Sequence, residues 1–115
     1  MIIDAAIKVH STLGPGLLES AYKACLVYEL RKRGLKVETE VPVPIVYDGL
    51  TIDPGYRLDV LVEEAVVVEA KALAKVLPVH ESQTLSHLKL ANHPVGLLIN
   101  FHSRRLKHGI TRLVN

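Results

Sequence analysis

The sequence contains one cysteine and no long apolar run. Cys25 has no second cysteine with which to form an intramolecular disulfide, and its place in a segment of helical apolar spacing favours a buried apolar role over a catalytic thiol. The chain has no stretch of about 18 uninterrupted apolar residues, and no cationic leader precedes an apolar core. The sequence therefore predicts neither a membrane span nor a secretory signal, and we expect a cytoplasmic protein.

Zinc-binding motifs are also absent. The chain has no cysteine pairs and no HExxH spacing that would support zinc binding by its histidines. Its net charge is only +2, which neither requires nor excludes nucleic acid as a partner. Basic residues gather near the C-terminus at Arg104, Arg105, Lys107 and Arg112. Such a patch suits nonspecific contact with phosphates, and a charged, solvated edge strand explains it equally well.

Length and composition fit one compact domain over residues 1–115. With 49% hydrophobic and 23% charged residues, the chain can bury about two-thirds of its unfolded surface. No repeat, linker or low-complexity segment divides it. Periodicity and turn signals predict helices near residues 2–10, 17–33 and 79–92, and strands at 35–47, from 50 onward, 55–62, 65–71, 95–100 and 109–114. The strand at 35–47 contains two prolines, which places it at an edge of the sheet.

The most informative segment runs from Asp59 to Lys71. Side chains alternate along a strand, so Glu69 and Lys71 point to the same face of the sheet. A two-residue turn would direct Asp59 to the opposite face. A three-residue turn at residues 63–65, or an even turn with one β-bulge, would bring Asp59 to the face of Glu69. A shared site therefore requires one of these two registers.

The chemistry of such a site is metal-assisted cleavage of a phosphodiester. Carboxylates hold Mg²⁺ or Mn²⁺ together with water, the cation activates the phosphodiester and a water, and a lysine stabilises developing charge. Asp59, Glu69 and Lys71 supply these groups. The alternative is an ordinary glutamate and lysine on the exposed face of a half-buried strand, because the spacing alone is a weak pattern.

A longer set of motifs accompanies this segment. Gly16, Glu19 and Tyr22 have the spacing GxxExxY, preceded by the segments 5–10 and 13–16 and followed by 55–59 and 96–101. In this order the motifs resemble the GxxExxY family of small proteins within the PD-(D/E)xK nuclease-like superfamily, over essentially the whole chain. The resemblance implies a mixed α+β fold with a restriction-endonuclease-like core, in which helices flank a mixed central β-sheet.

The resemblance also implies roles for individual residues. Asp59, Glu69 and Lys71 match the acidic and lysine positions of the superfamily. Glu19 matches a glutamate in the first helix of the family that often supplies an extra metal contact. In this chain Glu19 lies in the second predicted helix, which should therefore begin close to the carboxylate strands. Gln83 matches a helical glutamine of many relatives. Four residues after this glutamine, relatives commonly have tyrosine, whereas this chain has His87.

Three further side chains are candidates for the site, and each of them also has a purely structural explanation. Tyr22 shares a helix face with Glu19 and either lines the same cleft or packs with its hydroxyl in water. His10 lies on an apolar stripe, which favours a hydrogen-bonded core histidine over contact with a substrate. His87 shares a face with Gln83 and either faces the site or forms an exposed polar stripe.

Two functions from different classes remain. The first is a metal-dependent nuclease that acts on DNA or RNA, with Asp59, Glu69 and Glu19 as ligands of Mg²⁺ or Mn²⁺. The second is a noncatalytic nucleic-acid- or protein-binding module that retains the fold. A short chain leaves little room for a substrate-embracing insert, so a homodimer with a larger surface fits either function.

Overall fold

The computed structural model of the protein describes residues 1–115. Three α-helices, five strands and one short 3-10 helix follow one another along the chain. Their order and bounds are α1 (Ile2–Leu13), α2 (Glu19–Lys32), β1 (Val37–Tyr47), β2 (Leu50–Val62), β3 (Val66–Lys71), α3 (Pro78–Ala91), β4 (Val95–Asn100), η1 (Leu106–Gly109) and β5 (Ile110–Val114). The predicted helices and strands are present with bounds that differ by a few residues, except that the strands expected from residue 50 and at 55–62 form one strand.

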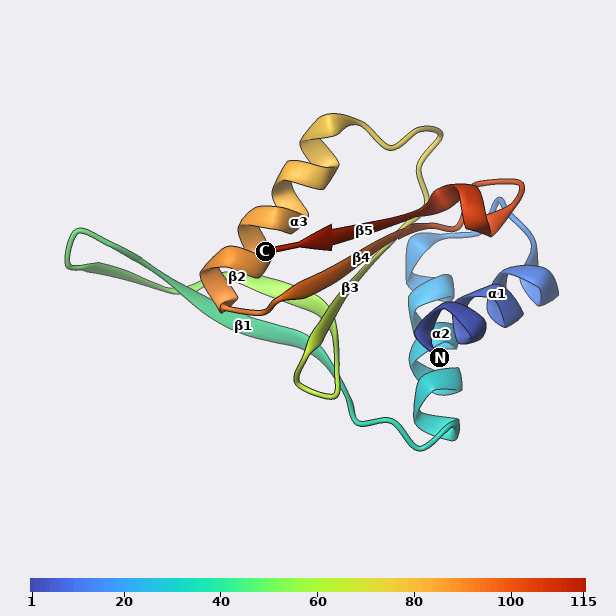
Figure 1. Cartoon of the computed structure of the whole chain (residues 1–115), viewed down its shortest axis with the longest axis horizontal. Coiled ribbons are helices and arrows are strands. Elements are labelled where there is room, and N and C mark those ends of the chain that lie inside the picture. Colours follow the sequence, from blue (N-terminus) through green and yellow to red (C-terminus); the bar gives the residue numbers. More distant parts are fainter.

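The strands form one mixed sheet in the order β1-β2-β3-β4-β5. Neighbouring strands are antiparallel except β3 and β4, which run parallel. A parallel pair needs a crossover connection, and α3 with its flanking loops supplies it. The structure confirms the expected mixed α+β architecture, with helices on both sides of a mixed central sheet (Figure 1).

Each face of the sheet has its own core. On one face, Tyr22 and Leu26 of the α2 helix pack with Val68 of β3, and α1 joins this larger core. On the other face, Leu88 of α3 packs against Val67. Val67 and Val68 point in opposite directions along the strand, so β3 is buried on both sides, as its run of valines indicates.

The turn between β2 and β3 sets the position of Asp59. Val62 pairs with Val66, which leaves a three-residue turn at residues 63–65. Two of the turn residues, Glu63 and Glu64, have left-handed backbones with φ of 54° each. This is one of the two registers that would allow Asp59 and Glu69 to share a site. In this register the residue opposite Asp59 is Glu69.

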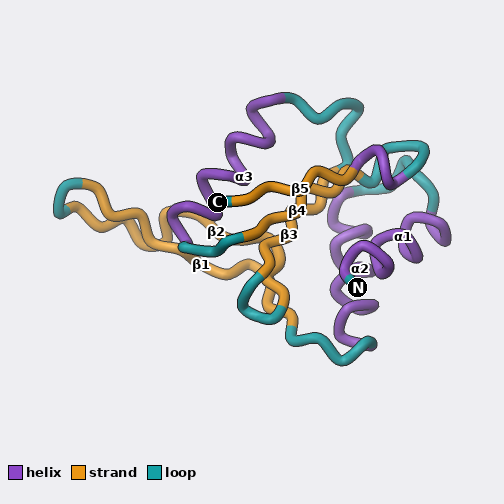
Figure 2. Tube along the Cα trace, viewed as in Figure 1, coloured by secondary structure: helices purple, strands orange, loops and turns teal.

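The hairpin of β1 and β2 extends beyond the rest of the sheet (Figure 2). β1 is an edge strand, as its prolines predict. The expected short strand from residue 50 and the following strand are instead one continuous strand. The pairing shifts between Val43 and Ile45. The side chain of Ile45 occupies the space that a Cβ at Gly55 would need, so the pairing of the strands at this point favours glycine.

The C-terminal basic residues do not form one patch. Arg104, Arg105 and Lys107 precede β5, in the loop after β4 and in η1, whereas Arg112 lies on β5 itself. Only Arg112 therefore fits the alternative of a charged edge strand. None of the three α-helices combines the length and the hydropathy that a membrane span requires.

Candidate functional site

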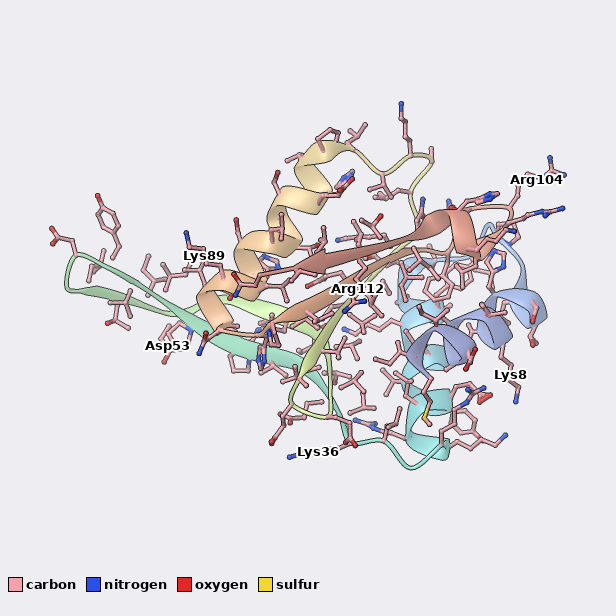
Figure 3. All side chains as sticks on the ribbon, viewed as in Figure 1. Lys8, Lys36, Asp53, Lys89, Arg104 and Arg112 are labelled. Atoms are coloured by element: carbon pink, nitrogen blue, oxygen red, sulfur yellow. The ribbon has the colours of Figure 1, made fainter.

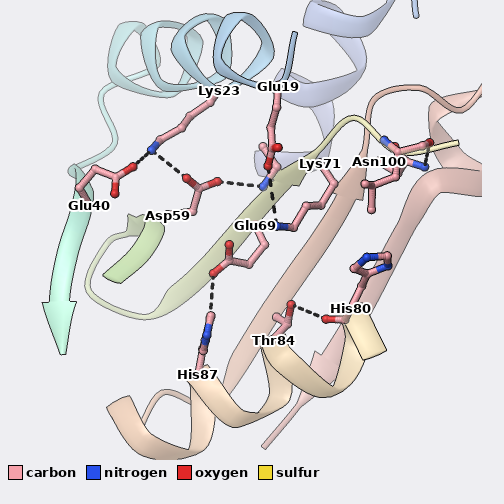
Figure 4. Close-up of polar contacts among 12 residues, drawn as sticks. Glu19, Lys23, Glu40, Asp59, Glu69, Lys71, His80, Thr84, His87 and Asn100 are labelled. Carbon is pink, nitrogen blue, oxygen red and sulfur yellow. Dashed lines mark hydrogen bonds and ion pairs between the residues drawn. The ribbon is translucent and has the colours of Figure 1, made fainter. Parts of the chain in front are cut away.

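Asp59 lies where the pairing of β2 and β3 ends. The last paired residues are Val60 and Val68, and beyond them the Asp59 carboxylate reaches across to β3. Its Oδ2 accepts a hydrogen bond from the Ala70 N–H at 3.1 Å (Figure 4). One oxygen of a partly buried carboxylate is thereby fixed between the two strands.

The other Asp59 oxygen contacts Lys23, a residue that sequence reasoning missed. Lys23 Nζ lies 2.8 Å from Asp59 Oδ1 and also forms an ion pair with Glu40 of β1 (Figure 4). Burial lowers the pKa of the Lys23 ammonium, but hydrogen bonds and charges from Asp59 and Glu40 outweigh burial and raise it. A signal was available, because Lys23 follows Glu19 by four residues and such residues share a helix face.

Glu69 is the buried carboxylate of the site, with only 7% of its surface exposed. Its Oε1 lies 3.4 Å from His87 Nδ1. Burial, followed by the negative charge of Asp59, raises the pKa of the Glu69 carboxyl from 4.5 to about 7. The charges of Lys71 and Lys23 oppose this rise. At neutral pH the site therefore exchanges a proton at Glu69, a property that is common in functional sites.

The α3 helix brings His87 to Glu69. The imidazole stacks on the ring of Tyr56 with centroids 4.4 Å apart, and the Tyr56 hydroxyl donates a hydrogen bond to the His87 carbonyl at 2.8 Å. Burial and the charge of Lys71 lower the pKa of His87. A mostly neutral imidazole is thus held against a carboxyl group that is partly protonated at neutral pH.

Lys71 ends β3 and meets Glu19 at the start of α2. Lys71 Nζ lies 3.8 Å from Glu19 Oε1, and both side chains are partly exposed. A surface hollow beside this contact is lined by Leu18, Glu19, Ser20, Lys23 and Asp59. The start of α2 therefore approaches the carboxylate strands, and Glu19 shares a hollow with Asp59 while it touches Lys71.

Gln83 lies one turn before His87 on α3 but faces solvent. It is exposed, and its amide makes no hydrogen bond within the protein. The residue that α3 buries at this level is Thr84, whose hydroxyl donates to the His80 carbonyl at 3.2 Å. Of the two candidates on this helix, the structure brings His87 to the carboxylates and leaves Gln83 outside their contacts.

Tyr22 points into the core. It is fully buried and stacks on Phe101 with centroids 4.8 Å apart. Its hydroxyl donates to the Gly14 carbonyl at 2.5 Å and accepts from the Leu17 N–H at 3.0 Å. Tyr22 is therefore a packing residue whose hydroxyl is bonded to the protein, and it supports the loop that precedes Glu19.

His10 is also a buried, hydrogen-bonded residue. Its ring Nε2 lies 2.7 Å from the Ser103 carbonyl oxygen, in the loop after β4. It makes no hydrogen bond or ion pair with the carboxylates of the site. This placement agrees with the core alternative and gives His10 a role in holding that loop.

The side chains at this position fit a hard divalent cation in part. Asp59 and Glu69 offer carboxylate oxygens, which Mg²⁺ and Mn²⁺ prefer, and a cation would relieve their repulsion. No group of three or more His, Cys, Asp or Glu side chains is placed to hold a metal ion. A cation held by Asp59 and Glu69 would lie close to the Lys23 ammonium and would complete its coordination with water.

Comparison with known proteins gives one match. The family model of the PD-(D/E)XK nuclease superfamily matches residues 1–113. No curated protein matches the chain, and no solved structure does. The mixed sheet flanked by helices is consistent with the restriction-endonuclease-like fold of this superfamily. Because the match covers almost every residue, the chain belongs to the PD-(D/E)XK nuclease superfamily.

Proposed function

We propose that this protein is a metal-dependent nuclease that hydrolyses phosphodiester bonds of DNA or RNA. In this proposal Asp59 and Glu69 bind Mg²⁺ or Mn²⁺, Glu19 is an auxiliary ligand, and Lys71 stabilises charge that develops during cleavage. The superfamily match supports a nuclease-like fold and a nucleic-acid substrate. The residue roles rest on the chemistry and placement of the side chains.

One observation carries the proposal. The three-residue turn brings Asp59 toward Glu69, and burial, followed by the charge of Asp59, raises the pKa of the Glu69 carboxyl to about 7. A buried carboxylate beside a second negative charge is stabilised by a proton or by a cation. Lys71 follows Glu69 by two residues, so it points to the same face of β3.

In this proposal each residue of the site has a separate role in cleavage. When bound, the divalent cation supplies Lewis-acid polarisation of the phosphodiester and lowers the pKa of the attacking water. Lys71 is partly exposed, and its contact with Glu19 is long, so the ammonium can turn toward a phosphate oxygen. Glu69 must lose its proton before it can bind the cation. His87 contacts Glu69 and is partly exposed, so the imidazole provides a route for this proton to solvent. Gln83 can reach only a substrate that extends over the exposed face of α3.

A second candidate function is noncatalytic binding of nucleic acid or protein. The observation that favours it is the Lys23–Asp59 ion pair. Together with the Ala70 N–H, Lys23 satisfies both oxygens of Asp59 by protein groups alone. This arrangement is expected of a noncatalytic domain in which the lysine ammonium takes the place of the cation beside Asp59.

We also propose membership of the GxxExxY family within the superfamily. The motif residues have clear physical roles in this chain. Tyr22 fixes the loop at residues 14–17 through its hydroxyl, and Glu19 begins α2 beside Lys71. The spacing of the motif thus links a buried anchor to a residue at the site.

The decisive experiment is cleavage of labelled single- and double-stranded DNA and RNA by purified protein with Mg²⁺, Mn²⁺ or EDTA. The control is Asp59→Asn, because asparagine removes the charge and keeps an oxygen that can accept from the Ala70 N–H. We expect cation-dependent cleavage of at least one substrate and a loss of roughly 100-fold or more in the variant. Binding without cleavage by the wild-type protein would favour the noncatalytic function.

A further inference from the structure

The C-terminal part of the chain is basic, and its charges are unpaired. After Glu81 the sequence contains no aspartate or glutamate. Its lysines and arginines in this part are Lys89, Arg104, Arg105, Lys107 and Arg112. None of them forms an ion pair. Unpaired basic side chains create a local positive potential that attracts anionic partners.

Two of these arginines line a polar hollow in the loop after β4. The hollow is lined by Ser103, Arg104, Arg105 and His108, with no apolar residue and no carboxylate among them. Arg104 and Arg105 are exposed, and Figure 3 shows Arg104 extending away from the body of the protein. Arg112 lines a different, mostly apolar hollow and does not belong to this surface.

The backbone of this loop is held firmly in place. The ring of buried His10 contacts the Ser103 carbonyl at 2.7 Å. Leu106 is buried in the larger core. A Cβ at Gly109 would overlap Ser103 Oγ and the Asn100 carbonyl oxygen, so the turn closes tightly on itself. The two arginines therefore extend from a fixed backbone.

A second hollow leads from this loop toward Glu19. It is lined by Gly16, Leu17, Leu18, Glu19, Ala72 and His102. His102 directly precedes Ser103, and its Nε2 lies 3.2 Å from the Leu17 carbonyl oxygen. The loop after β4 and the loop before α2 thus meet at this contact.

The second hollow continues into the hollow of the candidate site. Leu18 and Glu19 line both of them, and Asp59 lines the latter. The hollows at Asp59 and at His102 therefore adjoin each other, and the arginine hollow begins at Ser103, the residue that follows His102 in the chain. Glu19 lies along this path, but the nearby Lys71 offsets its negative charge.

We propose that this path is a track for the phosphate backbone of one nucleic-acid strand. We name it the phosphate track and define it by Glu19, His102, Ser103, Arg104, Arg105 and His108. In this arrangement the two arginines and Ser103 hold phosphates outside the candidate site, while the scissile phosphodiester lies at Asp59 and Glu69. The position of the scissile bond rests on the proposed nuclease function, whereas backbone binding by the arginines does not.

The chemistry of the track favours a nucleic acid over an acidic protein. Guanidinium groups bind phosphates and carboxylates alike in a bidentate manner, so the distinction rests on the neighbouring apolar surface. Exposed Leu17 and Leu18 provide an apolar wall in the middle hollow, which suits a sugar or a base face. The α2 helix also begins there without a side-chain cap, so its first N–H groups add to the positive potential.

The test is binding of a long labelled oligonucleotide in EDTA, measured by fluorescence anisotropy at several salt concentrations. The variant Arg104→Ala/Arg105→Ala removes two proposed phosphate contacts. The matched control Lys32→Ala/Arg33→Ala removes two positive charges at the far end of α2. We expect the loop variant to bind roughly tenfold more weakly and to flatten the salt dependence by about 1.4 to 1.8 units of slope. The control should change both quantities much less.

Two results would overturn the track. One is a loop variant whose affinity and salt dependence equal those of the control. The other is equal competition by polyglutamate and by unlabelled oligonucleotide at the same concentration of charge. Such a result would show general attraction of anions without recognition of phosphate.

A small phosphodiester separates the track from the nuclease function. Bis(4-nitrophenyl) phosphate reaches only the candidate site, so the loop variant should hydrolyse it at the wild-type rate while its KM for a long strand rises. Binding through the loop without cleavage of any substrate would reject the nuclease function and retain the track. Cleavage with unchanged KM for long strands in the loop variant would reject the track and retain the nuclease.

Discussion

Lys23 Nζ lies 2.8 Å from Asp59 Oδ1, which joins a helix ammonium to the strand carboxylate that the proposed cation would use. The same ammonium forms an ion pair with Glu40, and its charge lowers the pKa of Glu69. Lys23 therefore offsets the repulsion between the carboxylates of the cation-free protein. It would also compete with the proposed cation for Asp59.

Substitution of Lys23 by methionine should have opposite effects on stability and on cation binding. The cation-free variant should lose about 1–2 kcal/mol of unfolding free energy, because two carboxylates lose a charged hydrogen-bond donor. Its affinity for Mn²⁺ should rise, since no ammonium then competes for Asp59. Denaturant unfolding in EDTA measures the first effect, and calorimetric titration with Mn²⁺ measures the second.

Lys36→Met is the matched control for this variant. Lys36 pairs with Glu64 and Glu38 in an exposed part of the surface, so its loss should leave stability and Mn²⁺ binding nearly unchanged. Weaker Mn²⁺ binding by Lys23→Met than by this control would contradict the competition between lysine and cation.

Glu69 should make the cation-free protein less stable as the pH rises. Its folded pKa of about 7 lies above its ordinary value of 4.5, so the folded state holds the proton more tightly than the unfolded state. This stabilisation is fully present below the unfolded pKa and is lost as the pH rises through the folded pKa. The change amounts to on the order of 3 kcal/mol. Urea unfolding in EDTA from about pH 4 to about pH 8 measures it.

Glu69→Gln should remove this pH dependence and be more stable than the wild-type protein at the upper end of the range. It should also abolish the gain in Tm that we expect Mg²⁺ or Mn²⁺ to produce in the wild-type protein. Glu81→Gln, which alters a carboxylate outside the site, should retain both behaviours. Equal cation-induced Tm shifts in wild type and Glu69→Gln would exclude Glu69 as a ligand.

Tyr22→Phe should destabilise the protein without removing the metal-dependent chemistry. The substitution deprives the Gly14 carbonyl and the Leu17 N–H of a partly buried partner, at a cost of about 1–2 kcal/mol. Tyr28→Phe, at a position that is 67% exposed, should cost almost nothing. Thermal unfolding compares the two variants. Unchanged stability with loss of cleavage would instead give the Tyr22 hydroxyl a direct role at the site.

Local rules were sufficient for the elements that hold the carboxylates. Alternation along the strands showed that Asp59 and Glu69 can meet only in particular registers, and the three-residue turn adopts one of them. The prolines of β1 predicted an edge strand because a proline cannot donate a ladder hydrogen bond. These predictions succeeded because each depends on neighbours in the sequence.

Features set by distant contacts could not be predicted in this way. Helix spacing allows either Tyr22 or Lys23 to share the direction of Glu19, and the packing of α2 on the sheet turns Tyr22 into the core and Lys23 to Asp59. The raised pKa of Glu69 depends on its burial in the folded chain. The separation of Arg112 from Arg104 likewise depends on where η1 ends and β5 begins.

Lys71→Ala should distinguish an enzyme from a binding module. A lysine that stabilises transition-state charge contributes mainly to turnover, so cleavage should fall roughly 100- to 1,000-fold while nucleic-acid affinity falls only modestly. In a noncatalytic module the same substitution would only flatten the salt dependence of binding by about one unit of slope. Lys75→Ala, in the exposed loop after β3, controls for the loss of one positive charge. Cleavage by Lys71→Ala at the rate of this control would remove Lys71 from the proposed mechanism, even with Asp59→Asn inactive.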